Sequence, residues 1–279
     1  MNGPSLFRCP LCGSPLTREE RGCICPARHS FDRAAAGYVH LLPPNRMHSK
    51  APGDDREMVA ARAAFLERGY YAPLRQALEE LVLEASAHLE GPVLLDSGCG
   101  EGYYTAGMFR ALERAGHRPR AAGIDISKYA LRRAAKRLPE GEFAVASAYR
   151  LPLADASADL LTNVFSPLSA EEFARVLRPG GTFLYVVPSA RHLWEMKQVL
   201  YSQPYENPVK ETPYTGFSYQ RIVPVRYEIT LDCPEDIRAL FQMTPYYWKT
   251  PKSGCQRLAA LEELAVTISF DIHVFRREA

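Results

Sequence analysis

Short apolar runs alternate with amphipathic segments through the middle of the chain and predict strands and helices in turn. The apolar runs predict five buried strands, at residues 93–96, 121–125, 143–147, the start of 159–167, and 182–187. Helical segments are predicted at 103–114, from Ser127 onward, and just before Arg178-Pro-Gly-Gly181. A repeated order of strand then helix is typical of a doubly wound parallel sheet. We therefore expect an α/β fold.

Two further helices are predicted before the first of these strands. Asp54 is followed three residues later by Glu57, which resembles a capping box, and apolar positions then recur at helical spacing over 56–69. A second helix fits residues 73–89. The turn between the two helices carries a pair of aromatic residues, Tyr70 and Tyr71. These tyrosines either pack in the core or line a ligand cleft.

Charge is distributed unevenly along the chain. The 279 residues sum to +2, but residues 1–50 hold seven Lys or Arg against three Asp or Glu. This first part therefore carries +4 and the remainder −2. Residues 37–56 combine the positive bias with several prolines and glycines, which indicates a linker. An apolar content of 47% with 24% charged residues excludes wholesale disorder.

The sequence carries no membrane or export signal. No apolar run approaches the ~18–20 residues that a membrane span needs. The chain also reaches Cys9 without the charged start and apolar segment of a signal peptide. We therefore expect a cytoplasmic protein with no membrane partner, in which clustered cysteines bind metal rather than form disulfides.

Four of the seven cysteines lie within the first 25 residues. The motif Cys9-Pro-Leu-Cys12 is followed, after twelve residues, by Cys25-Pro-Ala-Arg-His29. Two such pairs can complete the tetrahedron that Zn²⁺ prefers, so we interpret Cys9, Cys12, Cys25 and His29 as a closed structural zinc site. Cys23 with Cys25 could supply the second pair instead, although the turn from Cys25 to His29 chelates more easily. The histidine argues against a rubredoxin-like iron site, and a module this small needs its metal to fold.

A glycine-rich loop follows the first predicted strand. It reads Asp96-Ser-Gly98-Cys-Gly100-Glu101-Gly102 and leads directly into the predicted helix at 103–114. The glycines let the backbone approach a ligand, and the helix N-terminus offers N–H groups to an anion. One residue separates the last two glycines, where a dinucleotide fingerprint has two. The carboxylate of Asp96 suits an ammonium group better than a pyrophosphate, so the loop favours S-adenosylmethionine (SAM).

The ends of the next strands agree with a nucleotide site. Asp125 ends the second strand and can accept both ribose hydroxyls, and it can also cap the helix that begins at Ser127. The third strand ends where adenine is normally flanked, and the loop after Asn163 lies at the switch point where ligands bind. The passage from helix through Pro-Gly-Gly to strand is common in SAM-dependent methyltransferases, and residues 91–190 resemble that class.

Taken together, the chain resembles the RlmA family of 23S rRNA (guanine-N1)-methyltransferases. The matching stretches keep one order over nearly the full chain: Cys9-Pro-Leu-Cys12, Cys25-Pro-Ala-Arg-His29, Gly37-Tyr-Val, Leu41-Leu-Pro43, Pro52-Gly-Asp54, Ala61-Arg-Ala-Ala-Phe65-Leu66, Asp96 through Thr105, Arg191-His-Leu193 and Gln242-Met-Thr-Pro245. The match weakens across residues 201–220, where three prolines suggest a loop peculiar to this relative.

The resemblance implies a class I, Rossmann-like SAM methyltransferase sheet with a small N-terminal zinc-binding module. We expect the zinc module at 1–36, a linker with helices at 37–90, and the methyltransferase domain at 91–279. The implied cofactors are SAM and a structural Zn²⁺, with Cys23 a bystander beside the zinc ligands Cys9, Cys12, Cys25 and His29. The implied SAM contacts are Tyr71, Gly100, Glu101 and His192, which join the loop and strand-end residues Asp96, Gly98, Gly102 and Asp125.

The implied reaction is methyl transfer to N1 of a single guanine in a 23S rRNA hairpin, at a 745- or 748-type position. N1 lies on the Watson–Crick edge, so the guanine must be unpaired or extruded before it reacts. N1 must also lose its proton; His192 has the chemistry of a base, but the catalytic residue stays unknown. A homodimer is one expected assembly. Some family members lower sensitivity to macrolides such as tylosin, and the sequence does not select among members.

Two rival functions remain open from the sequence. A methyltransferase acting on a small molecule would use the zinc module only as a brace, and it predicts no RNA affinity and a compact apolar pocket after Phe165. A non-catalytic RNA-binding protein could keep SAM as a sensor ligand. The intact loop from Asp96 to Gly102 argues against this second rival.

Overall fold

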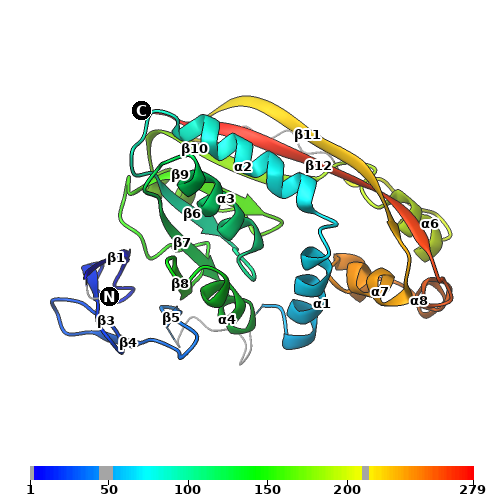
Figure 1. Ribbon diagram of the computed structural model, residues 1–279, viewed down its shortest axis with the longest axis horizontal. Coiled ribbons are helices and arrows are strands. Elements are labelled where there is room, and N and C mark those ends of the chain that lie inside the picture. The colour runs from blue at the N-terminus through cyan, green and yellow to red at the C-terminus, as the bar shows by residue number, and fades with distance from the viewer. Residues whose placement is uncertain (1–2, 44–52, 209–213) are drawn as a thin grey trace.

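The computed structural model describes residues 3–43, 53–208 and 214–279 of the chain. Its centre is the predicted alternation of strands and helices (Figure 1). The five predicted strands are present as β6 (Val93–Ser97), β7 (Arg120–Asp125), β8 (Glu142–Val145), β9 (Ala158–Val164) and β10 (Leu177–Pro188). The helices between them are α3 (Tyr103–Arg114), α4 (Lys128–Arg137) and α5 (Ala170–Val176). The expected α/β fold is confirmed.

Within the described residues, eight strands form the main sheet in the order β11-β12-β10-β9-β6-β7-β8-β5. The run from β10 to β5 (Val39–His40) is parallel, whereas the long hairpin of β11 (Phe217–Leu231) and β12 (Leu264–Arg277) pairs antiparallel with β10. The order reverses between β6 and β9, because the chain crosses from one half of the sheet to the other there. A sheet of this kind binds its ligand at that switch point, beyond the carboxyl ends of the strands.

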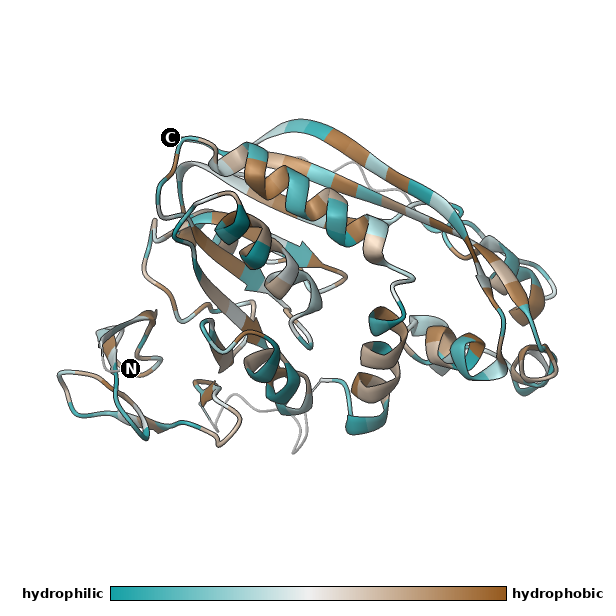
Figure 2. Ribbon diagram, viewed as in Figure 1, coloured by the Kyte–Doolittle hydropathy of each residue, from teal (hydrophilic) through white to brown (hydrophobic). Residues whose placement is uncertain are grey.

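The two faces of the sheet are covered by different parts of the chain. One apolar cluster joins the sheet to α2 (Ala72–Ser86), α3 and α4, which lie along one face (Figure 1). The cluster also includes Phe65 and Leu66 of α1 (Arg56–Glu67), a helix that packs against α4. A second cluster joins the opposite face to α5 and to residues of the N-terminal region, among them Phe7 and Leu16. Figure 2 shows α2 with a hydrophobic side in brown and a hydrophilic side in teal, in agreement with the burial of its leucines.

The N-terminal region forms a separate small sheet of β1 (Gly3–Arg8), β2 (Pro15–Arg18), β3 (Gly22–Ile24) and β4 (Ser30–Asp32), in that order. Glu142 at the start of β8 holds this sheet to the core. Its carboxylate accepts hydrogen bonds from Ser5 Oγ (2.5 Å) and Leu6 N (3.1 Å) and pairs with Arg120 (3.3 Å). The strand β5 lies in the predicted linker and joins the main sheet, so the linker contributes to the core. The domain boundaries 36/37 and 90/91 stay predictions.

The other end of the molecule is helical. The β11–β12 hairpin extends away from the core and carries α7 (Pro234–Gln242), the 3-10 turn η2 (Pro245–Trp248) and α8 (Lys252–Ala259) at its tip, beside α6 (Trp194–Leu200) (Figure 1). No helix among the described residues is long and apolar enough to span a membrane.

Two local predictions need correction. The N-cap of α1 is Asp55, whose carboxylate accepts from Glu57 N and Met58 N at 2.9 Å, and not Asp54. The carboxylate of Asp54 instead forms an ion pair with the side chain of Arg62. The predicted loop over 201–220 is too long, because β11 already begins at Phe217 and pairs with β12. Residues 209–213 of that loop, and 44–52 of the predicted linker, lie outside the described residues.

Candidate metal and cofactor sites

The structure brings four predicted ligands together at the tip of the N-terminal sheet. The ligand atoms of Cys9, Cys12, Cys25 and His29 all lie within 4.8 Å of one another. Cys12 Sγ is 3.7 Å from Cys25 Sγ, and His29 Nδ1 is 3.5 Å from Cys9 Sγ. A tetrahedral zinc ion with Zn–S bonds of about 2.3 Å separates its sulfur ligands by similar distances. The donor set therefore fits a closed Cys₃His zinc site.

Two tight turns present these side chains. In the first, Gly13 N donates to Cys9 O and the glycine adopts φ +74°, a backbone conformation that side chains rarely tolerate. In the second, Arg28 N donates to Cys25 O, and Arg28 takes φ +63°. Cys23 stands outside the cluster, buried in β3, and burial raises the pKa of its thiol to about 11. The geometry thus favours the turn from Cys25 to His29, rather than Cys23 with Cys25, as the source of the second pair.

The glycine loop between β6 and α3 has the shape of a ligand cradle. Gly98, Gly100 and Gly102 adopt φ +83°, +54° and +75°. The N–H groups of Gly98 and Cys99 donate to Ile124 O at 2.9 Å, so the loop is tied to the neighbouring strand β7. Gly102 is the N-cap of α3 and offers no side-chain cap, which leaves N–H groups of the first helical turn free for an anion.

Buried polar atoms beside the loop lack partners. Asp96 is 1% exposed; its Oδ2 accepts from Thr105 Oγ1 at 2.5 Å, but Oδ1 has no hydrogen-bond partner among the described residues. Burial raises the pKa of Asp96 to about 6. The buried hydroxyl of Tyr104 also lacks a partner in the described chain. Unpaired groups of this kind are costly unless a ligand satisfies them, so the site fits a cofactor that carries polar groups.

Asp125 lies at the end of β7 in a position to serve two roles. Its Oδ2 accepts from Gly100 N at 2.9 Å, and its Oδ1 accepts from Ser127 N at 2.7 Å. Ser127 in turn is the N-cap of α4. Burial raises the pKa of Asp125. The carboxylate thus fixes the glycine loop and begins the next helix, and each oxygen keeps a lone pair for a ribose hydroxyl.

An ion-pair bridge that the sequence analysis missed ties the linker to the loop. Arg62 Nε on α1 donates to Glu101 Oε2 at 2.8 Å, and Arg62 Nη1 pairs with Asp54. Glu101 is only 3% exposed, so Arg62 neutralises a carboxylate that the fold removes from water. The hydroxyl of Ser127 also donates to Asp54 O at 2.7 Å. Arg62 and Glu101 are 39 residues apart, and no pattern in the sequence indicates that they are in contact.

Tyr71 and His192 meet through Phe270, a residue of β12 that the sequence analysis also missed. The Phe270 ring lies 5.1 Å from Tyr71 and 4.4 Å from His192, between ring centroids. His192 Nδ1 accepts from Ser269 N at 3.2 Å, and burial, followed by the charge of Lys197, lowers the pKa of His192 to about 3. A neutral ring that accepts at Nδ1 carries its proton on Nε2. In this arrangement the free nitrogen of His192, Nε2, carries a proton that it can donate.

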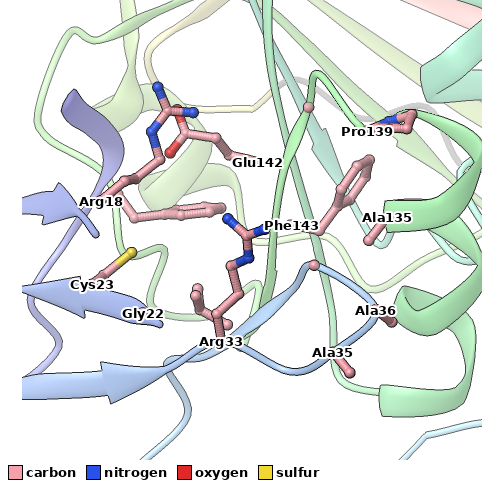
Figure 3. A pocket seen from close by; sticks show the side chains of 14 residues that line it. Arg18, Gly22, Cys23, Arg33, Ala35, Ala36, Ala135, Pro139, Glu142 and Phe143 are labelled. Carbon is pink, nitrogen blue, oxygen red and sulfur yellow. The ribbon is translucent and has the colours of Figure 1, made fainter. Parts of the chain in front are cut away.

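A cleft of about 230 Å³ separates the N-terminal sheet from the core on the α4 side (Figure 3). Figure 3 shows Arg18 beside Glu142, at 3.8 Å, with Arg33 in the same cleft. None of the predicted SAM or zinc residues lines it. The cleft belongs to the junction of the two parts of the chain.

Comparison with known proteins places these two sites in known classes. Residues 95–185 match a model described as a methyltransferase domain, and residues 7–50 match one described as the N-terminal zinc ribbon of RlmA. The crystal structure of the YcgJ protein from Bacillus subtilis has the same fold, with a TM-score of 0.51 at 17% identity over 73% of this chain and 99% of that one. Fold and site thus define a SAM-dependent methyltransferase with a zinc ribbon, and SAM and structural zinc are its cofactors.

Relatives define the family more closely. A Micromonospora griseorubida protein with the provisional name 23S rRNA (guanine-N(1)-)-methyltransferase is 36% identical over 97% of this chain and 96% of its own length. The Streptomyces fradiae 23S rRNA (guanine(748)-N(1))-methyltransferase is 40% identical over 70% of this chain and 67% of its own. The chain belongs to the RlmA family of 23S rRNA (guanine-N1)-methyltransferases, as the resemblance in sequence predicted.

Proposed function

We propose that this protein transfers a methyl group from SAM to N1 of a guanine in 23S rRNA. The observation that carries the proposal is the length of the match: the M. griseorubida relative aligns with 97% of the chain, through the zinc ribbon as well as the methyltransferase domain. A methyltransferase for a small molecule would have no need of the ribbon. The rRNA function therefore explains both parts of the chain.

When bound, SAM supplies an electrophilic methyl group on a positively charged sulfur. We assign its ammonium group to the free oxygen of Asp96 and its carboxylate to the first turn of α3, after Gly102. Asp125 would accept hydrogen bonds from the ribose hydroxyls, and Gly98, Gly100, Glu101 and Tyr71 would line the site. His192, as an Nε2–H donor, completes the set next to Phe270.

The protein's work on the guanine is to align N1 with the methyl carbon and to release the N1 proton. N1 would bond to the methyl carbon as the carbon–sulfur bond breaks, and the electron pair of that bond would stay on sulfur. We assign Asp96 and Asp125 to SAM, Glu101 is paired with Arg62, and His192 is a donor, so none of these site residues is assigned to take the proton. We assign proton loss to water at the open edge of the site.

For the zinc site we propose Cys9, Cys12, Cys25 and His29 as ligands and RNA as the partner of the surrounding surface. Exposed arginines of the module, Arg21, Arg28 and Arg33, have no acidic side chain within ion-pair distance among the described residues. They are available to phosphates, whereas Arg18 is occupied by Glu142. In this proposal the zinc module binds the RNA and the core binds SAM.

At a finer level we propose that the substrate is a single guanine in an rRNA hairpin, of the 745 or 748 type, and that the protein can assemble as a homodimer. A hairpin loop supports this proposal because it presents a guanine with an unpaired Watson–Crick edge.

The test is primer extension on 23S rRNA incubated with the protein and SAM. N1-methylguanine cannot pair, so reverse transcriptase should stop at one guanine, and the stop should vanish when SAM is left out. SAM binding without any stop on rRNA, or methylation only of a small molecule, would contradict the proposal. Chromatography of the nucleosides released from the hairpin, against an N1-methylguanosine standard, identifies the modified atom.

A further inference from the structure

We propose that the ring of Phe165 is the platform on which the target guanine stacks during methyl transfer. This inference rests on the proposed rRNA function. It adds a residue that positions the substrate base. The predicted SAM contacts and the motifs that match the family include no group for the base itself.

Phe165 lies where the guanine must come. It follows directly on β9 at the carboxyl edge of the sheet, at the switch point between β9 and β6. The next residue, Ser166, packs against the glycine loop so closely that a Cβ on Gly98 would lie 2.2 Å from the Ser166 side chain. Phe165 thus stands one residue away from the loop to which we assign SAM.

The backbone of Phe165 has a conformation that phenylalanine rarely adopts. Its φ is +54°, in the left-handed region that favours glycine. The strain is maintained by a buried network: Asn163 Nδ2 donates to Ser166 Oγ at 2.7 Å, and Ser166 Oγ donates to Ser97 O at 2.7 Å. Such strain costs on the order of a factor of ten in stability and concentrates at functional sites. Leu193, directly after His192, is also left-handed, with φ +55°.

The Phe165 ring packs against a buried aromatic ring and is still nearly half exposed. Its centroid is 4.9 Å from that of Phe270, which is 1% exposed and also contacts His192 and Tyr71. Phe165 itself is 46% exposed, which is unusual for a phenylalanine beside a buried aromatic cluster. Packing alone would bury this ring. An exposed aromatic with a rigid backing is the geometry that an unstacked base uses.

The chemistry of the substrate supplies the reason. A guanine whose N1 is to be methylated has left its pair and its neighbours in the stack, and it needs a π-surface to replace them. A base on an aromatic side chain gains binding worth roughly 5- to 150-fold. Stacking fixes the plane of the base and leaves its Watson–Crick edge free to face the methyl group.

The test compares three substitutions that separate stacking from folding. Phe165→Gly removes the ring and its contact with Phe270 but suits φ +54°, so the protein should still fold. Phe165→Leu keeps apolar bulk without a flat ring, and Phe165→Tyr keeps the ring. Ala156→Gly is the matched control, since Ala156 is an exposed left-handed residue (φ +47°) in a loop outside the site.

We expect single-turnover methylation of the rRNA hairpin at saturating SAM to fall at least tenfold for Phe165→Gly and at least fivefold for Phe165→Leu. Phe165→Tyr should stay within about threefold of the original rate, and Ala156→Gly should not change it. The Kd for SAM should stay within twofold in all four variants.

Full activity of Phe165→Gly or Phe165→Leu, while the original protein methylates guanine N1, would overturn this inference and leave the proposed function standing. A loss of SAM affinity in parallel with activity would also overturn it, because Phe165 would then be a cofactor contact. If the original protein forms no N1-methylguanine on rRNA, the proposed function fails, and this inference fails with it.

Discussion

The zinc ribbon and the methyltransferase core are stabilised in different ways. In the core, side chains such as Leu94, Leu161 and Phe143 are at most 2% exposed, and each such burial contributes roughly 1.5–3 kcal/mol. Among residues 3–36 of the ribbon, Phe7 and Leu16 are the large side chains buried to the same degree, and they pack against the core. The ribbon therefore depends on its metal for the stability that the core obtains from packing. It follows that each part can be damaged without the other.

The largest effect should come from the zinc ligands. Cys9→Ser removes one of four ligands from a site whose metal contributes about 10–16 kcal/mol in isolated zinc modules. We expect zinc content to fall from about one ion per chain to near zero and rRNA methylation to fall at least 100-fold. Zinc analysis by mass spectrometry, together with the methylation assay, checks both expectations.

Cys23→Ala is the matched control for that experiment, because Cys23 is a buried cysteine of the same sheet outside the cluster. It should retain its zinc. Zinc loss in Cys23→Ala with retention in Cys9→Ser would reverse the assignment of the ligands.

The next effect concerns the ion-pair bridge of the core. Arg62→Met leaves the Glu101 carboxylate buried without its partner, which costs about 3–5 kcal/mol in comparable buried pairs. We expect the thermal midpoint of the core to drop by several degrees while zinc content is unchanged. Adding Glu101→Gln to Arg62→Met should recover part of the loss. A double variant as unstable as the sum of its parts would show that the pair does not interact.

Asp96 should dominate the affinity for SAM. Asp96→Asn removes the charge that we assign to the ammonium group, and charge-assisted hydrogen bonds contribute about 1.5–3 kcal/mol, or roughly 10- to 150-fold in Kd. Isothermal titration with SAM measures the loss. The exposed carboxylate of Asp155, substituted as Asp155→Asn, is the control and should leave Kd unchanged. An equal Kd for Asp96→Asn and the original protein would remove Asp96 from the site.

The same carboxylate predicts a pH dependence of cofactor binding. Burial raises the pKa of Asp96 to about 6, so the unliganded protein takes up a proton there as pH falls. An ammonium ligand prefers the ionised form, and SAM affinity should therefore be constant above about pH 7 and weaken about tenfold by pH 5. In Asp96→Asn this slope should be absent. A flat profile in the original protein would contradict the contact with the ammonium group.

The smallest effect should come from single arginines of the ribbon. Arg28→Ala removes one phosphate contact from an exposed side chain, and we expect a few-fold loss of rRNA affinity with a shallower dependence on salt. Arg118→Ala is the control, since Arg118 is 85% exposed on the core and pairs only with the exposed Glu90. Filter binding at two salt concentrations measures both. Equal losses for the two variants would place RNA on the core as well.

Much of the core could be predicted because its signals are local. A buried parallel strand is a continuous apolar run, so β6, β7 and the glycine loop stand out in the sequence. The zinc pairs are equally local, since each comes from one turn. What the sequence did not reveal depends on distant contacts. Strands β11 and β12 pair residues that are at least 33 positions apart, Arg62 pairs with Glu101 across 39 residues, and Phe165, directly after β9, contacts Phe270 in β12.

The central claim is that the ribbon binds RNA and the core binds SAM. The most direct test measures two dissociation constants on one preparation of purified Cys9→Ser, one for SAM and one for the rRNA hairpin. If the ribbon holds RNA and the core holds SAM, the Kd for SAM stays within about twofold of the original protein and the Kd for the hairpin rises at least tenfold. Loss of SAM binding, or RNA binding that survives without zinc, would contradict the separation of the two sites.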